Sequence, residues 1–148
     1  MEKRCSISVV VNGGRWLQAG EALASNGSLP RRWTLDGLKD YVSLRIGSQL
    51  GRTLEQIEYT DLRWCRDRAN SLDHEAVTAG FAVISAPYIG SEDVGAGLSL
   101  EAVEAANSGC EALVVVGGQI TWQPLRQKLE AKGVALFELL LPASGKVL

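Results

Sequence analysis

The chain has 148 residues, with 15 Lys or Arg, 17 Asp or Glu and one His, which gives a formal net charge of −2. This length suits one ordinary domain with a substantial core, so we expect residues 1–148 to form a single unit. The balanced charge excludes a global attraction to nucleic acid or to a membrane, although basic side chains gather before residue 70 and acidic ones after it.

The cysteines and the hydropathy limit the class of protein further. Cys5, Cys65 and Cys110 are odd in number and widely spaced, and His74 is the single histidine. They match no zinc-binding spacing, so we expect free thiols in a cytoplasmic protein. The apolar run that follows the first charged residues is too short for a signal peptide, and no run is long enough for a membrane span.

Apolar periodicity and turn residues predict alternating strands and helices along the chain. The first half predicts a strand over 5–11, a helix over 15–24, a helix from a Thr34 cap to residue 49, and a strand over 55–64. The second half predicts a polar loop over 65–70, a helix to residue 79 capped by Ser71 or Asp73, a strand over 81–86, a glycine loop over 88–97, a helix over 98–108, and a strand, helix and strand over 112–141.

The stretch 112–141 is the clearest of these units. Residues 112–116 form an unbroken apolar run, as expected of a strand buried on both faces, and Gly117 and Gly118 end it. Pro124 suits the first turn of a helix, where its missing N–H costs nothing. The alternation of strands and helices predicts an α/β fold, a three-layer α/β/α sandwich with a mostly parallel central sheet.

Three segments lie where strands are expected to end or helices to begin. They are Val11-Asn12-Gly13-Gly14-Arg15, Val94-Gly95 with Glu101 in the helix behind it, and Gly117-Gly118-Gln119-Ile120-Thr121-Trp122-Gln123-Pro124-Leu125. In order and spacing they resemble motifs of the NYN family, a branch of the PIN-like nuclease fold, and the match covers about residues 6–141. Members of that family carry Asp-Gly-x-Asn, Val-Asp and Ser-Gly-Asp-x-Asp-Phe-x-Pro-Leu at these places. Their acids bind Mg²⁺ or Mn²⁺, and a metal-activated water cuts RNA.

The resemblance implies a PIN-like, Rossmann-type fold whose site lacks its acids. Asn12, Gly95, Gln119 and Thr121 fill the acid positions, and Glu101 is the one family acid retained. Hard divalent cations need anionic oxygens, and metal-assisted hydrolysis needs the cation. We therefore expect a degenerate nuclease with no catalytic residues and no bound metal or cofactor.

The remaining polar groups of that cleft are candidate ligand-binding residues. Asn12, Arg15, Gln119 and Thr121 would form a neutral-to-positive pocket, in which a phosphate binds to Arg15 and to loop N–H groups. The alternative is that these residues have drifted in a cleft without function.

Two basic-aromatic clusters are the other candidates. They consist of Arg31, Arg32 and Trp33, and of Arg63, Trp64, Arg66 and Arg68. Arginine beside tryptophan suits stacking on single-stranded bases together with phosphate contacts. The same residue types suit a protein interface, or a solvated surface whose tryptophans belong to the core.

The leading hypothesis is a catalytically inactive, NYN-type domain that acts as a regulatory or adaptor protein by binding RNA or a protein partner. One alternative is a ribonuclease that uses Mg²⁺ or Mn²⁺ at a site rebuilt from Glu101 and Asp93. A second alternative is a structural homodimer or a subunit of a complex. A membrane is not expected as a partner.

Overall fold

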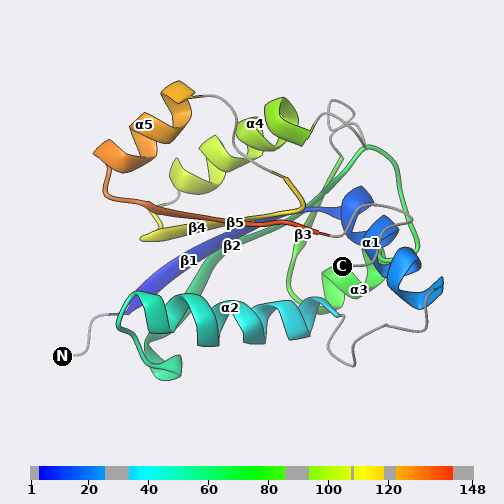
Figure 1. Cartoon of the computed structure of the whole chain (residues 1–148), viewed down its shortest axis with the longest axis horizontal. Helices are drawn as coiled ribbons and strands as arrows, with labels where there is room; N and C mark the ends of the chain where they lie inside the picture. The colour runs from blue at the N-terminus through cyan, green and yellow to red at the C-terminus, as the bar shows by residue number, and fades with distance from the viewer. Residues whose placement is uncertain (1–3, 26–33, 86–93, 108, 119–122, 142–148) are drawn as a thin grey trace.

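The computed structural model describes residues 4–25, 34–85, 94–107, 109–118 and 123–141, with the backbone alone for 22–25 and 94–100 (Figure 1). The strands are β1 (Cys5–Asn12), β2 (Ile57–Arg66), β3 (Ala82–Ser85), β4 (Ala112–Val116) and β5 (Ala135–Leu139). The helices are α1 (Gly13–Ser25), α2 (Leu35–Gln49), α3 (Asp73–Thr78), α4 (Val94–Asn107) and α5 (Gln123–Ala131), and a 3-10 turn, η1 (Leu54–Gln56), precedes β2.

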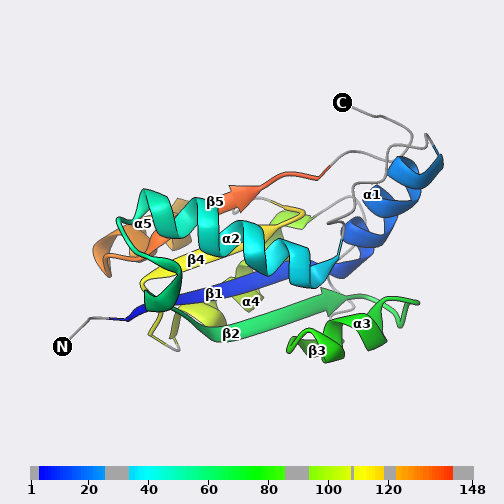
Figure 2. The same cartoon turned by 90° about the horizontal axis from the view of Figure 1, so that it is seen from below.

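The five strands form one sheet in the order β3-β2-β1-β4-β5, and all four neighbouring pairs are parallel. Helices α4 and α5 cover one face, while α2 and α3 cover the other (Figure 1). Seen from below, α2 lies across the middle of the sheet, and α1 projects beyond the ends of the strands (Figure 2). The prediction of a three-layer α/β sandwich is therefore confirmed.

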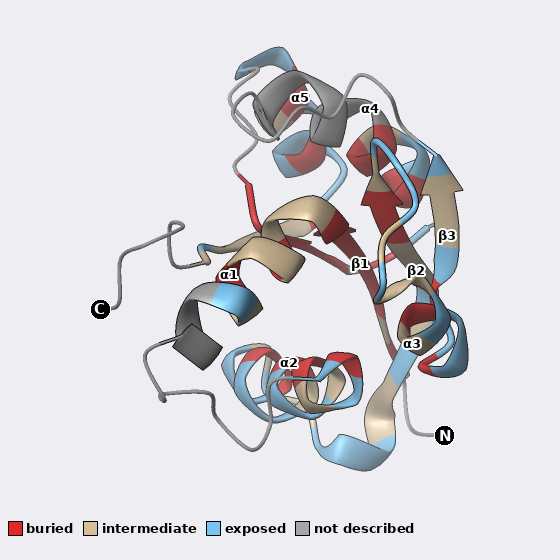
Figure 3. Ribbon diagram, turned by 90° about the vertical axis from the view of Figure 1, so that its right-hand side faces the viewer, coloured by how far each residue is buried: buried red, intermediate tan, exposed pale blue. Residues whose placement is uncertain are grey.

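Strand β1 lies at the centre of the sheet and separates two apolar clusters. Ile7, Val9 and Val11 pack on the α2 side, and Val10 packs on the α4 side. Burial is concentrated along β1 and on the helix sides that face it (Figure 3). A strand covered on both faces needs apolar side chains at successive positions, which explains the continuous runs in the sequence.

Several predicted boundaries are confirmed and others are wrong. Thr34 caps α2, because its Oγ1 accepts the Gly37 N–H at 2.9 Å. The predicted loop after residue 64 is wrong at its start, since β2 continues through Arg66 and pairs with β3. Neither Ser71 nor Asp73 caps α3, because the N-cap position belongs to Leu72, whose side chain makes no capping hydrogen bond.

Helix α4 begins at Val94, so the predicted glycine loop is wrong over its last residues. Each glycine in a helix costs about 1 kcal/mol relative to alanine. Further along α4, Ala102, Ala105 and Ala106 are buried in the cluster beneath it, and this packing stabilises the helix. The glycines at its start do not prevent it from forming there.

Helix α1 begins at Gly13, against the indole ring of Trp64. A Cβ at Gly13 would lie 2.6 Å from Trp64 Cε2, and that ring is fully buried. At Gly14 the situation differs, because among the described residues an added Cβ meets only Asn12 Oδ1, 3.6 Å away. Packing requires glycine at position 13 and does not require it at position 14.

Gly13→Ala is expected to lower the free energy of unfolding by roughly 1–3 kcal/mol, because the methyl group overpacks a buried ring. Gly14→Ala is expected to be neutral or to stabilise the protein by up to about 1 kcal/mol, as alanine is the better helix former. Urea unfolding of both variants measures the difference. Equal effects of the two substitutions would contradict this account of α1.

Candidate functional site

The strand order reverses between β1 and β4. The chain builds β1, β2 and β3 outward on one side, and then places β4 and β5 on the other side of β1. In open parallel sheets, the carboxyl ends of the two strands at such a reversal border a crevice where ligands bind. Asn12 is the last residue of β1, and Gly117 and Gly118 follow β4 at this edge.

Asn12 is the residue that defines the edge. It is 2% exposed, and its Oδ1 accepts the backbone N–H of Arg15 at 3.1 Å, which caps the first turn of α1. That bond fixes the amide orientation, because a flipped amide would set an NH₂ group against the N–H. The Nδ2 atom is buried and has no hydrogen-bond partner in the described part of the chain.

A buried donor without an acceptor costs about 1–3 kcal/mol. Native proteins satisfy most such groups, so an unpaired donor calls for an explanation. The Asn12 amide therefore leaves two N–H bonds unused at the carboxyl end of the central strand.

The first turn of α1 adds further donors at the same edge. This helix has 13 residues, its first N–H groups have no acceptor within the helix, and its N-terminal end carries a partial positive charge. Gly117 brings the end of β4 against this turn. A Cβ added there would lie 3.3 Å from the Cβ atoms of both Arg15 and Asn12, and its φ of 84° favours glycine.

Glu101, the family acid that the resemblance retains, is buried in α4 and is paired. Arg63 on β2 donates from Nη1 to Glu101 Oε1 at 3.1 Å, and also binds Asp61 and Glu104. Hydrogen bonds to Asp61 raise the pKa of Arg63 against the opposing effect of burial. Arg63 therefore remains cationic and is shared among the carboxylates of Asp61, Glu101 and Glu104.

Cys65 lies beside Asn12 in the pairing of β1 with β2, and its side chain is buried. Burial, followed by the negative charge of Glu101, raises the pKa of the Cys65 thiol to about 12. Since the thiolate is the nucleophilic form, Cys65 is an inert core residue.

The predicted cluster around Trp64 is divided by the fold. Trp64 is fully buried and donates from Nε1 to Asp73 Oδ1 at 2.8 Å, so of the three alternatives for this cluster the one that places its tryptophan in the core is confirmed. Arg66 binds the same carboxylate, with Nη2 to Oδ2 at 3.0 Å. Arg68 differs, because its side chain is 88% exposed and reaches Asp67 only at 3.9 Å. Of the three arginines in this cluster, Arg68 is the one with an exposed side chain.

Several predicted ligand residues lie outside the described residues. They are Arg31, Arg32, Trp33, Asp93, Gln119 and Thr121. Gly95 falls in the first turn of α4, where the backbone alone is described. The structure therefore brings together Asn12 and Arg15 of the predicted pocket.

The described groups at this edge do not fit a nuclease metal centre. Asn12 gives its oxygen to an N–H and presents N–H bonds, which repel a cation. Glu101 is held by Arg63. Among the residues that the structure describes, no three His, Cys, Asp or Glu side chains gather in a way that could hold a metal ion.

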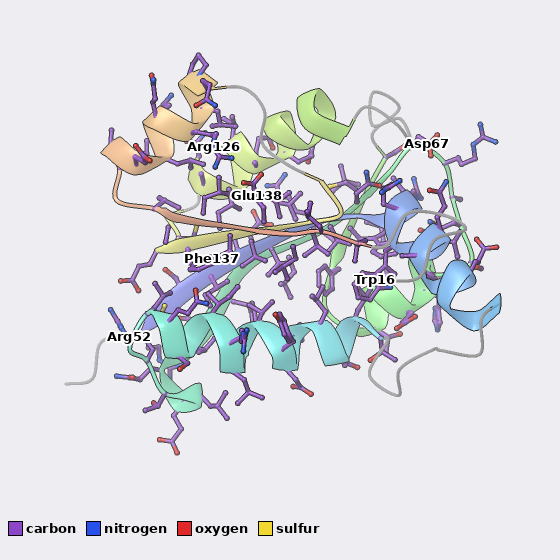
Figure 4. The ribbon with its side chains drawn as sticks, viewed as in Figure 1. Trp16, Arg52, Asp67, Arg126, Phe137 and Glu138 are labelled. Carbon is purple, nitrogen blue, oxygen red and sulfur yellow. The ribbon has the colours of Figure 1, made fainter. Side chains whose placement is uncertain are left out.

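A groove of about 1060 Å³ lies between α2 and β5. Its wall on α2 includes Tyr41 and Leu44, and its other wall includes Leu140, all three of which are exposed apolar side chains. Figure 4 shows Phe137 and Trp16 on the side of the sheet that faces α2. Sequence reasoning missed this groove, although apolar residues on both sides of the 35–49 helix were a signal for it.

Sequence reasoning predicted that Gly117 ends a strand, but it gave Gly14 no role of its own. The glycine pairs 13–14 and 117–118 are visible in the sequence. The distances from an added Cβ to neighbouring atoms are needed to tell which of these glycines the packing requires.

Comparison with known proteins finds no family that matches the chain, no matching curated protein and no matching solved structure. Within the described part of the chain, no helix has both the length and the apolar composition needed to cross a membrane.

The pairing of Asp73 with Arg66 predicts a dependence of stability on pH. Burial of Asp73 opposes its ionisation, but hydrogen bonds from Arg66 and Trp64 outweigh this and hold the pKa of the carboxyl below its ordinary value of 3.8. A lowered pKa contributes stability that is complete above the ordinary value and is lost as pH falls through the folded-state value.

Asp73→Asn is expected to lower the free energy of unfolding at pH 7 by about 1–3 kcal/mol, since it leaves Arg66 without its anion. Urea unfolding should show that the difference from the unmodified chain shrinks below pH 3.8. Asp67→Asn, at an exposed and loosely paired carboxylate, is the control and should have little effect. A difference that is equal at pH 7 and at low pH would contradict this prediction.

Proposed function

We propose that the chain is a non-catalytic, NYN-like domain that binds RNA as a regulatory or adaptor protein. The observation that carries the proposal is the orientation of the Asn12 amide. At the strand end where the resembled nucleases place an acid, Asn12 spends its oxygen on α1 and leaves two N–H donors unpaired. Donors bind phosphate oxygens, whereas a metal ion needs the reverse polarity.

The surrounding electrostatics support an anion at this edge. The N-terminal end of α1 carries a partial positive charge and is a common place for phosphate groups. Arg15 adds a guanidinium in the first turn of the helix. Glu101, the acid that the resemblance retains, is paired with Arg63.

The remaining contacts to RNA are assigned by residue type and exposure. Arg68 offers an exposed guanidinium for a phosphate. Arg31, Arg32 and Trp33 have the composition that stacks on single-stranded bases, and we assign them that role in the proposal. Phosphate contacts supply affinity without reading sequence, so the proposal implies weak sequence preference and strong salt dependence.

The competing nuclease hypothesis needs carboxylates that are free to bind metal. Glu101 would have to give up its ion pair with Arg63, which would keep its bonds to Asp61 and Glu104. The other acid positions of the resembled family hold Asn12, Gly95, Gln119 and Thr121, so Glu101 would bind a cation with neutral partners only.

Fluorescence polarisation with a labelled single-stranded RNA tests the proposal. The chain should bind RNA in EDTA, and Mg²⁺ or Mn²⁺ should cause no cleavage. Asn12→Asp should weaken binding by roughly 10–100-fold, because aspartate keeps the helix cap but replaces two donors by a negative charge. Gln127→Glu, at an exposed position of α5, makes the same charge change away from the edge and should leave affinity unchanged.

Cleavage that requires metal and disappears in Glu101→Ala would overturn the proposal in favour of a ribonuclease. If no RNA binds and light scattering shows self-association that Leu44→Glu abolishes, the structural alternative replaces it, with the groove beside α2 as the interface.

A further inference from the structure

We infer that the group bound beside Asn12 is a terminal phosphate monoester, as found at an RNA end or on a mononucleotide, and not an internal phosphodiester. This inference rests on the anion binding proposed above and specifies the chemistry of the ligand. Its basis is the depth of the unpaired donor, the number of donors around it and the opening at Gly14.

The depth of Asn12 selects the shape of the ligand. Asn12 is 2% exposed, its Nδ2 atom is buried, and Gly117 lies close beside it. An internal phosphodiester carries a nucleoside on each side, so both would have to enter the crevice before an oxygen could reach Nδ2. A monoester has one substituent and can enter with its free oxygens first.

The number of donors matches a group with three free oxygens. Asn12 Nδ2 supplies two N–H bonds that nothing in the described residues accepts. The first turn of α1 supplies backbone N–H groups at Gly13 and Gly14 that have no acceptor within the helix. A phosphate monoester offers three strong acceptor oxygens and about −1.5 to −2 charges at pH 7, more than a diester offers on either count.

Gly14 provides the approach. Among the described residues, a Cβ at this position would meet only Asn12 Oδ1, at 3.6 Å, so those residues leave room for a methyl group there. A glycine that packing does not require, at the start of a helix, allows an anion to come close to the backbone. The end of β1 therefore combines an unpaired buried donor with a helix N-terminus that begins in two glycines.

Three forms of one internally labelled ten-nucleotide RNA test the inference on the full chain. One form carries a 5′-phosphate, one a 3′-phosphate, and one hydroxyl groups at both ends. At least one phosphorylated form should bind about tenfold or more tightly than the hydroxyl form. The hydroxyl form lacks the terminal phosphate that accepts hydrogen bonds from Asn12 and α1, and losing those bonds weakens binding by about that factor. The comparison of the two phosphorylated forms identifies which end enters.

Two variants connect that preference to the site. Gly14→Ala, whose methyl group would occupy the approach, and Asn12→Ser, which keeps a helix cap but removes Nδ2, should each abolish the preference while leaving the unfolding transition in place. Gln127→Ala, on the exposed side of α5, is the control and should retain it. Equal binding of all three RNAs, with Asn12→Asp weakening each of them, would overturn the monoester inference and leave the proposed RNA binding intact. Absence of binding to every form would overturn both.

Discussion

Strand β1 and its two parallel neighbours fix the rest of the structure. Every residue from Ile7 to Asn12 is buried, so the backbone groups of β1 depend on pairing with β2 and β4. The resulting register sets Val11 opposite Trp64 on one side and Val116 on the other. Three strand ends thereby meet at one edge, and the indole of Trp64 determines where α1 can begin.

The charged groups near that edge are matched with one another. Arg63 joins β2 to α4 through Glu101, and Arg66 joins β2 to α3 through Asp73. These acidic and basic side chains bind one another, whereas the sequence alone suggests that they are free to bind a ligand. Asn12 contrasts with them, because its amide carries hydrogen-bonding capacity that the described residues leave unused. The polarity of that unused capacity, donor instead of acceptor, is what distinguishes an anion site from a cation site.

Much of the fold could be predicted from the sequence, because its signals are local. The valine run in β4 and the Thr34 cap of α2 each depend on residues close together in the chain. The site could be predicted only in outline. That Trp64 points into the core, and that Arg66 meets a carboxylate from α3, are consequences of tertiary packing. The unpaired donor of Asn12 is likewise visible only when burial and every neighbouring acceptor are known together.

The most direct test of the donor site is nuclear magnetic resonance of the uniformly ¹⁵N-labelled chain. The side-chain amide of Asn12 would be followed while adenosine monophosphate is added to one sample and Mn²⁺ to another. We predict that the nucleotide shifts the Asn12 NH₂ and Gly14 N–H signals to saturation, and that Mn²⁺ leaves their intensities unchanged. Selective broadening of these signals by Mn²⁺, with no response to the nucleotide, would show that the edge binds cations and would contradict the account.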